Sequence, residues 1–141
     1  MNAKQRIGIV GAGLMGHGIA KNLVEKGFPL AVRGRRNRVP IDDLVKRGAT
    51  EVKTNADLAR ASDIVILCVT GAPQVEEVMF GPEGVASAAR PGTIVVDTST
   101  SEPATTAKMR EALAKQDVRF VDAPLARTPV EAEQGRLNTM V

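Results

Sequence analysis

The sequence predicts an α/β domain with a doubly wound parallel sheet, and three observations support this fold class. Short apolar runs rich in valine and isoleucine alternate with stretches of helical periodicity. The apolar runs are continuous, which is typical of strands that are covered on both faces. A glycine-rich turn joins the first run to the first helical stretch. Repeated strand–helix–strand units of this kind form right-handed crossovers in a parallel sheet.

Each element follows from its local pattern. Strands are expected at residues 7–10 (IGIV), 30–32 (LAV), 63–69 (DIVILCV), 93–97 (TIVVD) and 119–123 (RFVDA). Helices are expected at residues 14–26, 55–61, 74–80 and 103–116, with a further helix start near Pro40. Asn55 is a good N-cap residue, and Pro103 suits a first helical turn, where its missing N–H has no partner. Residues 81–84 (GPEG) and 90–93 (RPGT) are expected to form turns.

Length and composition restrict the class of protein. We expect one domain over residues 1–141. No apolar run approaches the ~20 residues of a membrane-spanning helix, and the polar N-terminus favours a cytoplasmic location without a membrane partner. The single cysteine, Cys68, excludes an internal disulfide and is interpreted as a buried small side chain. A net charge of +3 without tryptophan or tyrosine argues against a nucleic-acid partner, and no metal site is expected.

The turn at residues 11–16 carries the pattern G-x-G-x-x-G, which indicates dinucleotide binding when it follows a strand and opens a helix. Gly11 would permit the tight turn, Gly13 would let a pyrophosphate approach the backbone, and Gly16 would allow close helix packing. The helix N-terminus would offer free N–H groups to the phosphates. A plain tight turn is the alternative. The candidate cofactor-binding residues are Gly11, Ala12, Gly13, Leu14, Met15 and Gly16.

The only histidine, His17, directly follows this turn. We expect a solvated surface position for it. A catalytic role is not expected, because phosphates and not a reacting carbon would lie beside it.

The region after the second expected strand, LAVRGRRNRVP, bears on the choice of dinucleotide. An acidic residue ~20 positions beyond the glycine turn usually holds the adenosine ribose of NAD, yet no acid occurs between Glu25 and Asp42. Arginine can bind a 2′-phosphate through paired hydrogen bonds. NADP is therefore favoured over the alternative, NAD, although an ordinary basic loop would look the same. The candidates are Arg35 and Arg36, with Arg33 or Arg38 as outer partners.

Three segments resemble the β-hydroxyacid dehydrogenase family, which contains 3-hydroxyisobutyrate, tartronate semialdehyde and 6-phosphogluconate dehydrogenases. IGIVGAGLMGHGIAKNL resembles the opening of that family. GPEGVASAARPGTIVVDTSTSEPATTAKM resembles its substrate-side segment, typically D-x-S-T-x-x-P. VRFVDAPLARTPVEAEQGRLNTMV resembles its next signature, typically D-A-P-V-S-G-G followed by G-T-L-x-x-M-V. The resemblance runs from about residue 6 to the last residue.

The resemblance implies a Rossmann-like NADP-binding domain of an oxidoreductase, without the all-helical domain that follows it in the family. The implied reaction moves a hydride between NADP(H) and a small β-hydroxyacid or its semialdehyde, with a lysine as general acid/base. That lysine would fall beyond Val141, so no catalytic residue is expected here and the 141-residue fragment is expected to be inactive. Lys108 and Lys115 are expected to lie on a solvated helix face. The full-length enzyme is expected to be a homo-oligomer.

Residues at the ends of two expected strands complete the predicted site. Asp97 to Thr100 follow a strand whose carboxyl end would face the ligand crevice. Thr98 and Ser99 are candidates for the cofactor, and Ser99 before Thr100 for the substrate, with helix capping as the alternative. Val69 and Thr70 resemble family positions that line the adenosine side of the cofactor.

One departure from the family pattern concerns the substrate. Ala126, Arg127 and Thr128 stand where the family often has Ser-Gly-Gly. Arg127 would either bind an anionic group of the substrate or turn to solvent. The expected partner is a small anionic hydroxyacid or aldehyde, bound by Ser99, Thr100, Ala126, Arg127 and Thr128. Two alternatives stay open, a stand-alone NADP-binding or regulatory module without catalysis, and a fragment of an imine reductase.

Overall fold

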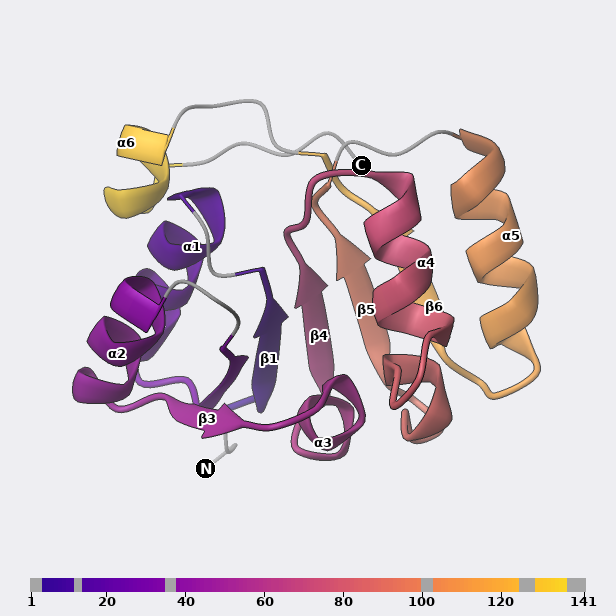
Figure 1. Cartoon of the computed structure of the whole chain (residues 1–141), viewed down its shortest axis with the longest axis horizontal. Coiled ribbons are helices and arrows are strands. Elements are labelled where there is room, and N and C mark those ends of the chain that lie inside the picture. The colour runs from indigo at the N-terminus through magenta and orange to yellow at the C-terminus, as the bar shows by residue number, and fades with distance from the viewer. Residues whose placement is uncertain (1–3, 12–13, 35–37, 100–102, 125–128, 137–141) are drawn as a thin grey trace.

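The computed structural model describes residues 4–11, 14–34, 38–99, 103–124 and 129–136, and it confirms the doubly wound α/β fold (Figure 1). Its strands are β1 (Ile7–Val10), β2 (Leu30–Arg33), β3 (Thr50–Val52), β4 (Ile64–Leu67), β5 (Ile94–Asp97) and β6 (Arg119–Asp122). Its helices are α1 (Leu14–Glu25), α2 (Arg38–Lys46), α3 (Asn55–Arg60), α4 (Ala72–Phe80), the 3₁₀ helix η1 (Val85–Ser87), α5 (Pro103–Ala114) and α6 (Pro129–Glu133).

The sheet has the strand order β3-β2-β1-β4-β5-β6, and all neighbouring strands are parallel. The chain first winds outward from β1 to β3 and then crosses back to β4 on the other side of β1. The direction of winding therefore reverses between β1 and β4, which pair from Ile7↔Ile64 to Val10↔Leu67. Ligands of open α/β sheets bind outside the carboxyl ends of the strands at such a switch point.

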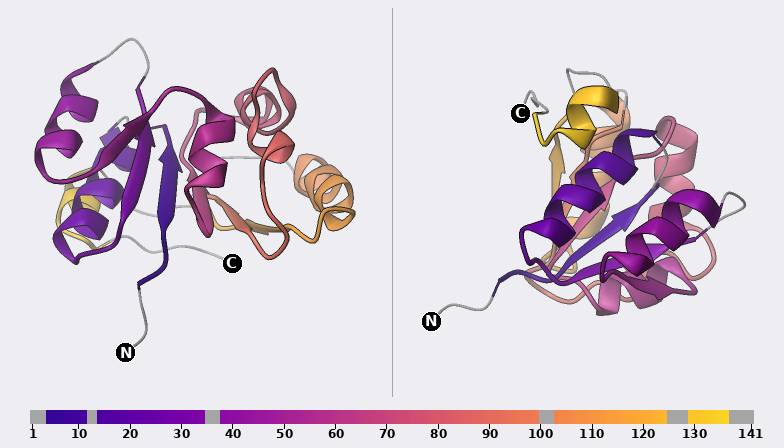
Figure 2. Two further views of the ribbon diagram at one scale, coloured as in Figure 1. Left: turned by 90° about the horizontal axis from the view of Figure 1, so that it is seen from below. Right: turned by 90° about the vertical axis from the view of Figure 1, so that its left-hand side faces the viewer.

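Strand side chains alternate between two apolar clusters on opposite faces of the sheet. In β4, Val65 and Leu67 are buried in the cluster that α3, α4 and α5 cover. Ile64 and Ile66 pack against the cluster that α1 and α2 cover. This two-sided burial explains the continuous apolar run in the sequence. The short helix α6 lies beside α1 (Figure 2).

The structure corrects some expected elements. The five expected strands and the four expected helices form within one or two residues of their expected bounds. The strand β3 was not expected, because its three residues are exposed or half-buried and make no apolar run. The helix α6 and the 3₁₀ helix η1 were not expected either.

The expected cap of α3 was wrong. Thr54 is the N-cap, and its hydroxyl accepts a hydrogen bond from the Asp57 N–H at 3.0 Å. Asn55 is instead the first helical residue and is buried. Both residue types cap helices well, so the local pattern did not decide between two adjacent candidates.

Within the described residues, none of the helices combines the length and the apolar character that crossing a membrane requires.

Candidate functional site

The turn after β1 requires a glycine at its first position. Gly11 has a φ of +94°, in the region that L side chains rarely adopt. A Cβ at Gly11 would also lie 2.1 Å from the carbonyl oxygen of Cys68, at the end of the neighbouring strand β4. The Cys68 N–H holds the two strand ends together by donating to the Val10 carbonyl at 2.9 Å. The expected tight turn at Gly11 is therefore present at the switch point.

Close packing at Gly16 is also present, but its partner differs from the expected one. A Cβ at Gly16 would lie 1.9 Å from the carbonyl oxygen of Gly11. At Gly16, the helix α1 therefore packs more closely against the backbone of Gly11 in the turn than against a strand. Ala12 and Gly13 lie outside the described residues. Met15 is half-buried at the start of α1.

The helix α1 begins at Leu14, shortly after β1 ends at the switch-point edge of the sheet, and the first N–H groups of a helix have no partner within it. α1 is 12 residues long and has no acidic residue in its first turn. The positive end of its dipole is therefore not neutralised by its own side chains. This end of the helix therefore has the features of an anion-binding site.

Three predicted residues that lie just beyond the ends of β4 and β5 meet at the same edge. The Val69 N–H donates to the Ser99 hydroxyl at 2.9 Å, and the Thr98 hydroxyl donates to the Leu67 carbonyl at 2.7 Å. Ser99 is only 3% exposed, so its hydroxyl serves first to hold the ends of β4 and β5 together. Thr70 is exposed next to Val69. Thr100 lies outside the described residues, as do the substrate candidates Ala126, Arg127 and Thr128.

Cys68 lies at the same strand end and is half-buried, so the expected burial of this small side chain is only partial. Burial raises the pKa of Cys68 above its ordinary value, and a hydrogen bond with Thr98 opposes that shift only in part. The side chain therefore stays a thiol at neutral pH and is a poor nucleophile.

The first and the last arginine of the arginine-rich region, Arg33 and Arg38, already have partners within the protein. The Nε of Arg33 donates to the Lys53 carbonyl at 3.3 Å, and Arg38 pairs with Glu51 and Asp42. Arg35 and Arg36 lie outside the described residues. Glu51 was not among the predicted residues, because an acid that holds the ribose is expected directly after the second strand, and β3 was not expected.

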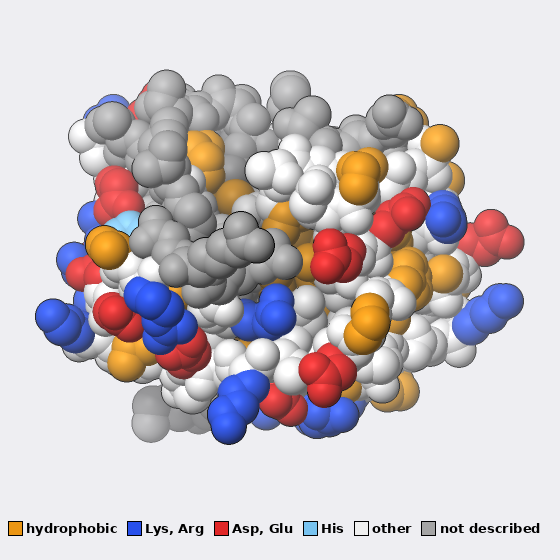
Figure 3. Space-filling model, in the orientation of Figure 1, with side chains coloured by type: hydrophobic (Ala, Val, Ile, Leu, Met, Phe, Trp, Pro, Cys, Tyr) orange, Lys and Arg blue, Asp and Glu red, His pale blue; other side chains and the backbone are white. Residues whose placement is uncertain are grey.

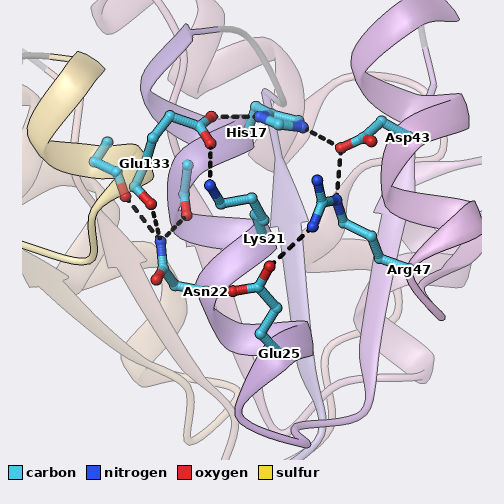
Figure 4. Close-up of polar contacts among 9 residues, drawn as sticks. His17, Lys21, Asn22, Glu25, Asp43, Arg47 and Glu133 are labelled. Atoms are coloured by element: carbon cyan, nitrogen blue, oxygen red, sulfur yellow. Dashed lines mark hydrogen bonds and ion pairs between the residues drawn. The ribbon is translucent and has the colours of Figure 1, made fainter.

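The expected solvated position of His17 was wrong. Its side chain is 20% exposed and lies between two carboxylates (Figure 4). Its Nδ1 is 2.5 Å from Glu133 Oε1 on α6, and its Nε2 is 2.6 Å from Asp43 Oδ2 on α2. The local pattern could not reveal this position, because both partners come from helices distant in the sequence.

The charged cluster around His17 extends along α1, as Figure 4 shows. Glu133 also pairs with Lys21 at 2.6 Å, and Asp43 also pairs with Arg47 at 2.9 Å. Arg47 reaches back to Glu25 at 2.8 Å. We call His17, Lys21, Glu25, Asp43, Arg47 and Glu133 the α1 charge cluster; it joins α2 and α6 to α1.

The α1 charge cluster alters the protonation of its members. Burial by itself would lower the pKa of His17, but hydrogen bonds and charges from Glu133 and Asp43 outweigh burial and raise it. The hydrogen bond from His17 is the largest cause of the lowered pKa of Asp43. Burial opposes the shift at Glu133, yet Lys21 and His17 lower its pKa overall. No described group of histidine, cysteine, aspartate or glutamate side chains is arranged to hold a metal ion.

The parallel sheet, its switch point and the glycine turn against the N-terminus of α1 define a class of protein, the dinucleotide-binding Rossmann domain. Comparison with known sequences gives the particular family. Residues 6–141 match the family described as the NAD binding domain of 6-phosphogluconate dehydrogenase, and the chain belongs to this family. The resemblance noted in the sequence is thereby confirmed.

Individual relatives agree with this assignment. The chain is 36% identical over 141 residues to 2-(hydroxymethyl)glutarate dehydrogenase of Eubacterium barkeri, covering 100% of this chain and 46% of that protein. It is 34% identical over 137 residues to 2-hydroxy-3-oxopropionate reductase of Escherichia coli K12, covering 96% and 46%. A solved structure of Psf3 in complex with NADP+ and 2-OPP superimposes with a TM-score of 0.87 at 30% identity, covering 94% and 47%. The chain thus spans about half the length of these relatives.

Proposed function

We propose that this chain is the NADP(H)-binding domain of an oxidoreductase that transfers hydride between the cofactor and a small β-hydroxyacid or its semialdehyde. The observation that carries the proposal is the glycine turn at the switch point, packed against the N-terminus of α1. Two relatives named as a dehydrogenase and a reductase of small hydroxyacids support the reaction class. The NADP+ complex of Psf3 supports the cofactor class. A cytoplasmic location and a homo-oligomeric full-length enzyme remain part of this proposal.

The residues at the switch point fit a dinucleotide. Side chains at Gly11 and Gly16 would collide with backbone atoms, so no Cβ stands at these two positions of the turn. These two glycines keep the turn packed tightly against β4 and α1, and Gly13, which lies outside the described residues, would let a pyrophosphate approach the main chain and accept hydrogen bonds from the first N–H groups of α1. We assign this role to residues 11–16. A nicotinamide group bound beyond this turn would supply or accept the hydride.

The ends of β4 and β5 would order the cofactor and the substrate. The Ser99 hydroxyl accepts a hydrogen bond from the Val69 N–H. The backbone that would line the adenosine side of the cofactor is therefore held in place without a ligand. Because a hydroxyl that accepts one hydrogen bond can still donate its proton, Ser99 retains a donor for a substrate carboxylate or the nicotinamide amide. We assign the anionic substrate to Ser99, Thr100, Ala126, Arg127 and Thr128, and the adenosine side to Val69 and Thr70, with Thr98 also at the cofactor.

The arginines after β2 distinguish NADP from NAD. A 2′-phosphate is a strong acceptor for the fork of donors on arginine, whereas a 2′-hydroxyl is not. We assign the 2′-phosphate to Arg35 and Arg36, with Arg33 as an outer partner. This assignment makes the preference for NADP depend on a few side chains outside the glycine turn.

Cofactor titration tests the proposal. NADPH and NADH are followed by their own fluorescence, since the chain has no tryptophan to interfere. Replacing Arg35 and Arg36 together by alanine should weaken NADPH binding by at least about tenfold, because hydrogen bonds between charged groups are lost, and leave NADH binding unchanged. The control is Arg60→Ala on α3, which removes an arginine paired with Asp57 at 2.9 Å.

Three results would contradict the proposal. Failure of the unmodified chain to bind either dinucleotide would overturn the cofactor function. An equal loss of NADPH and NADH affinity in the double variant would overturn the role of these arginines at the 2′-phosphate. A loss of the same size in the Arg60→Ala control would show a general effect of charge.

A further inference from the structure

The space beside the end of β2 is filled by an ion pair. In a Rossmann domain, the residues after the second strand meet the adenosine ribose of the cofactor. Gly34 occupies this position, and a Cβ there would lie 2.3 Å from Nη1 of Arg38 and 2.4 Å from Oε2 of Glu51. The absence of a side chain at Gly34 therefore makes room for the Arg38–Glu51 pair.

The pair has a two-pronged geometry. Arg38 Nη1 donates to Glu51 Oε2 at 2.6 Å, and Arg38 Nη2 donates to Glu51 Oε1 at 2.7 Å. The same Nη2 lies 3.3 Å from Asp42 Oδ1. Two parallel hydrogen bonds of this kind fix the plane of a guanidinium group.

Glu51 reaches this place through the sheet. It lies on β3 opposite Val32 of β2, so strand pairing brings a carboxylate to the side of β2. Arg38 is the first residue of α2, and its guanidinium group meets Glu51 at the position that a Cβ of Gly34 would occupy. Figure 3 shows acidic and basic side chains next to each other on this face of the molecule. An acid that the sequence lacks directly after β2 is thus supplied by the neighbouring strand.

Both groups stay charged and partly open to solvent. The hydrogen bond with Glu51 raises the pKa of Arg38, and the same bond lowers the pKa of Glu51. The side chain of Arg38 is 48% exposed and that of Glu51 is 34% exposed, so a ligand can reach them. A 2′-phosphate that approached Arg38 would meet a guanidinium group already bound by Glu51. The negative charges of Glu51 and Asp42 would both lie beside the phosphate.

We propose that Glu51 is a specificity-determining residue that lowers the preference for NADP over NAD. It does so by occupying the donors of Arg38, by placing a negative charge beside the 2′-phosphate position, and by offering a carboxylate to the ribose hydroxyls of NAD. This inference rests on the proposed cofactor function. The ratio of NADPH to NADH affinity would then depend both on the arginines after β2 and on the acid on β3.

The test compares Glu51→Gln with Glu76→Gln. Glu76 is a matched control, because it is an exposed carboxylate on α4 that pairs with Lys108 at 3.2 Å. The dissociation constants of NADPH and NADH are measured for the unmodified chain and for both variants, and circular dichroism checks their fold. Glu51→Gln should raise the ratio of NADPH to NADH affinity about fivefold, a size typical of one exposed charge interaction. Glu76→Gln should leave the ratio unchanged.

A second variant shows whether the effect acts through Arg38. In an Arg38→Gln background, Glu51→Gln should change NADPH affinity less than it does alone, because the donors that Glu51 occupies are gone. Weaker NADPH binding in Glu51→Gln would overturn the inference, since Glu51 would then be positioning Arg38 for the phosphate. An unchanged ratio would overturn it too and leave the proposed function standing. If the unmodified chain binds neither dinucleotide, both fail.

Discussion

The two faces of the sheet are held in different ways. The face under α3, α4 and α5 has the larger apolar cluster, with fully buried side chains such as Leu58, Met79 and Met109. The face under α1 and α2 has a smaller apolar cluster, and the α1 charge cluster adds ion pairs at its outer side. We infer that the first face is stabilised mainly by apolar burial, whereas the stability of the second face also depends on the protonation of its ion pairs.

The largest effect is expected from the apolar face. Leu58 is fully buried, and Leu58→Ala should lower the free energy of unfolding by about 2–5 kcal/mol through lost burial and a cavity. Denaturant unfolding measures this loss. Val45→Ala on α2 is the control, because Val45 is 42% exposed and its truncation should change stability by less than about 0.5 kcal/mol. Equal costs for the two variants would show that the apolar face does not carry the stability assigned to it.

A smaller, pH-dependent effect is expected from the charged face. Because the pKa of His17 is raised in the folded state, its contribution is fully present below the unfolded pKa of about 6.5 and is lost as the pH rises through the folded pKa. The carboxylates of Asp43 and Glu133 have lowered pKa values, so their contribution is lost as the pH falls through those values. Stability from the cluster should therefore be greatest at mildly acidic pH.

Replacing His17 by glutamine tests this pH dependence. His17→Gln should lower the free energy of unfolding by about 1 kcal/mol at pH 6, and by less as the pH rises through the folded pKa of His17, where the imidazole of the unmodified chain loses its proton. Unfolding curves at several pH values provide the measurement. Lys21 and Arg47 also face these carboxylates and are present in both the variant and the unmodified chain, so the comparison isolates the imidazole. A constant difference between variant and unmodified chain at all pH values would refute the role of the histidine charge.

The smallest effect is expected from a charge pair on the apolar half of the molecule. Lys108 and Glu76 join α5 to α4, but their side chains are 65% and 45% exposed. Solvent screens such a pair, so Glu76→Gln should change the free energy of unfolding by less than about 0.5 kcal/mol. Thermal unfolding at low and high salt measures it. A loss as large as that of His17→Gln would mean that charge pairs matter equally on both faces.

Local patterns in the sequence were sufficient for most of the sheet and for the glycine turn. Apolar runs such as IVIL in β4 are set by burial on two faces, and Gly11 is set by a backbone conformation that few residues adopt. The family followed from motifs in these same segments. The wrong or missing predictions at the site, and the missing strand β3, have a different cause. His17 and Glu51 have partners on other elements, and β3 depends on the strand beside it and not on its own composition.

The central position of β1 has a consequence for folding kinetics. β1 must pair with β4, and the residues just before these strands, Arg6 and Asp63, are 57 positions apart in the chain. Closing such a long loop costs entropy before the strand contacts compensate for it, so non-local parallel pairing is slow. During synthesis, the glycine turn cannot pack against the end of β4 until β4 has left the ribosome. The crevice is therefore a late product of folding, although its first glycines are among the first residues made.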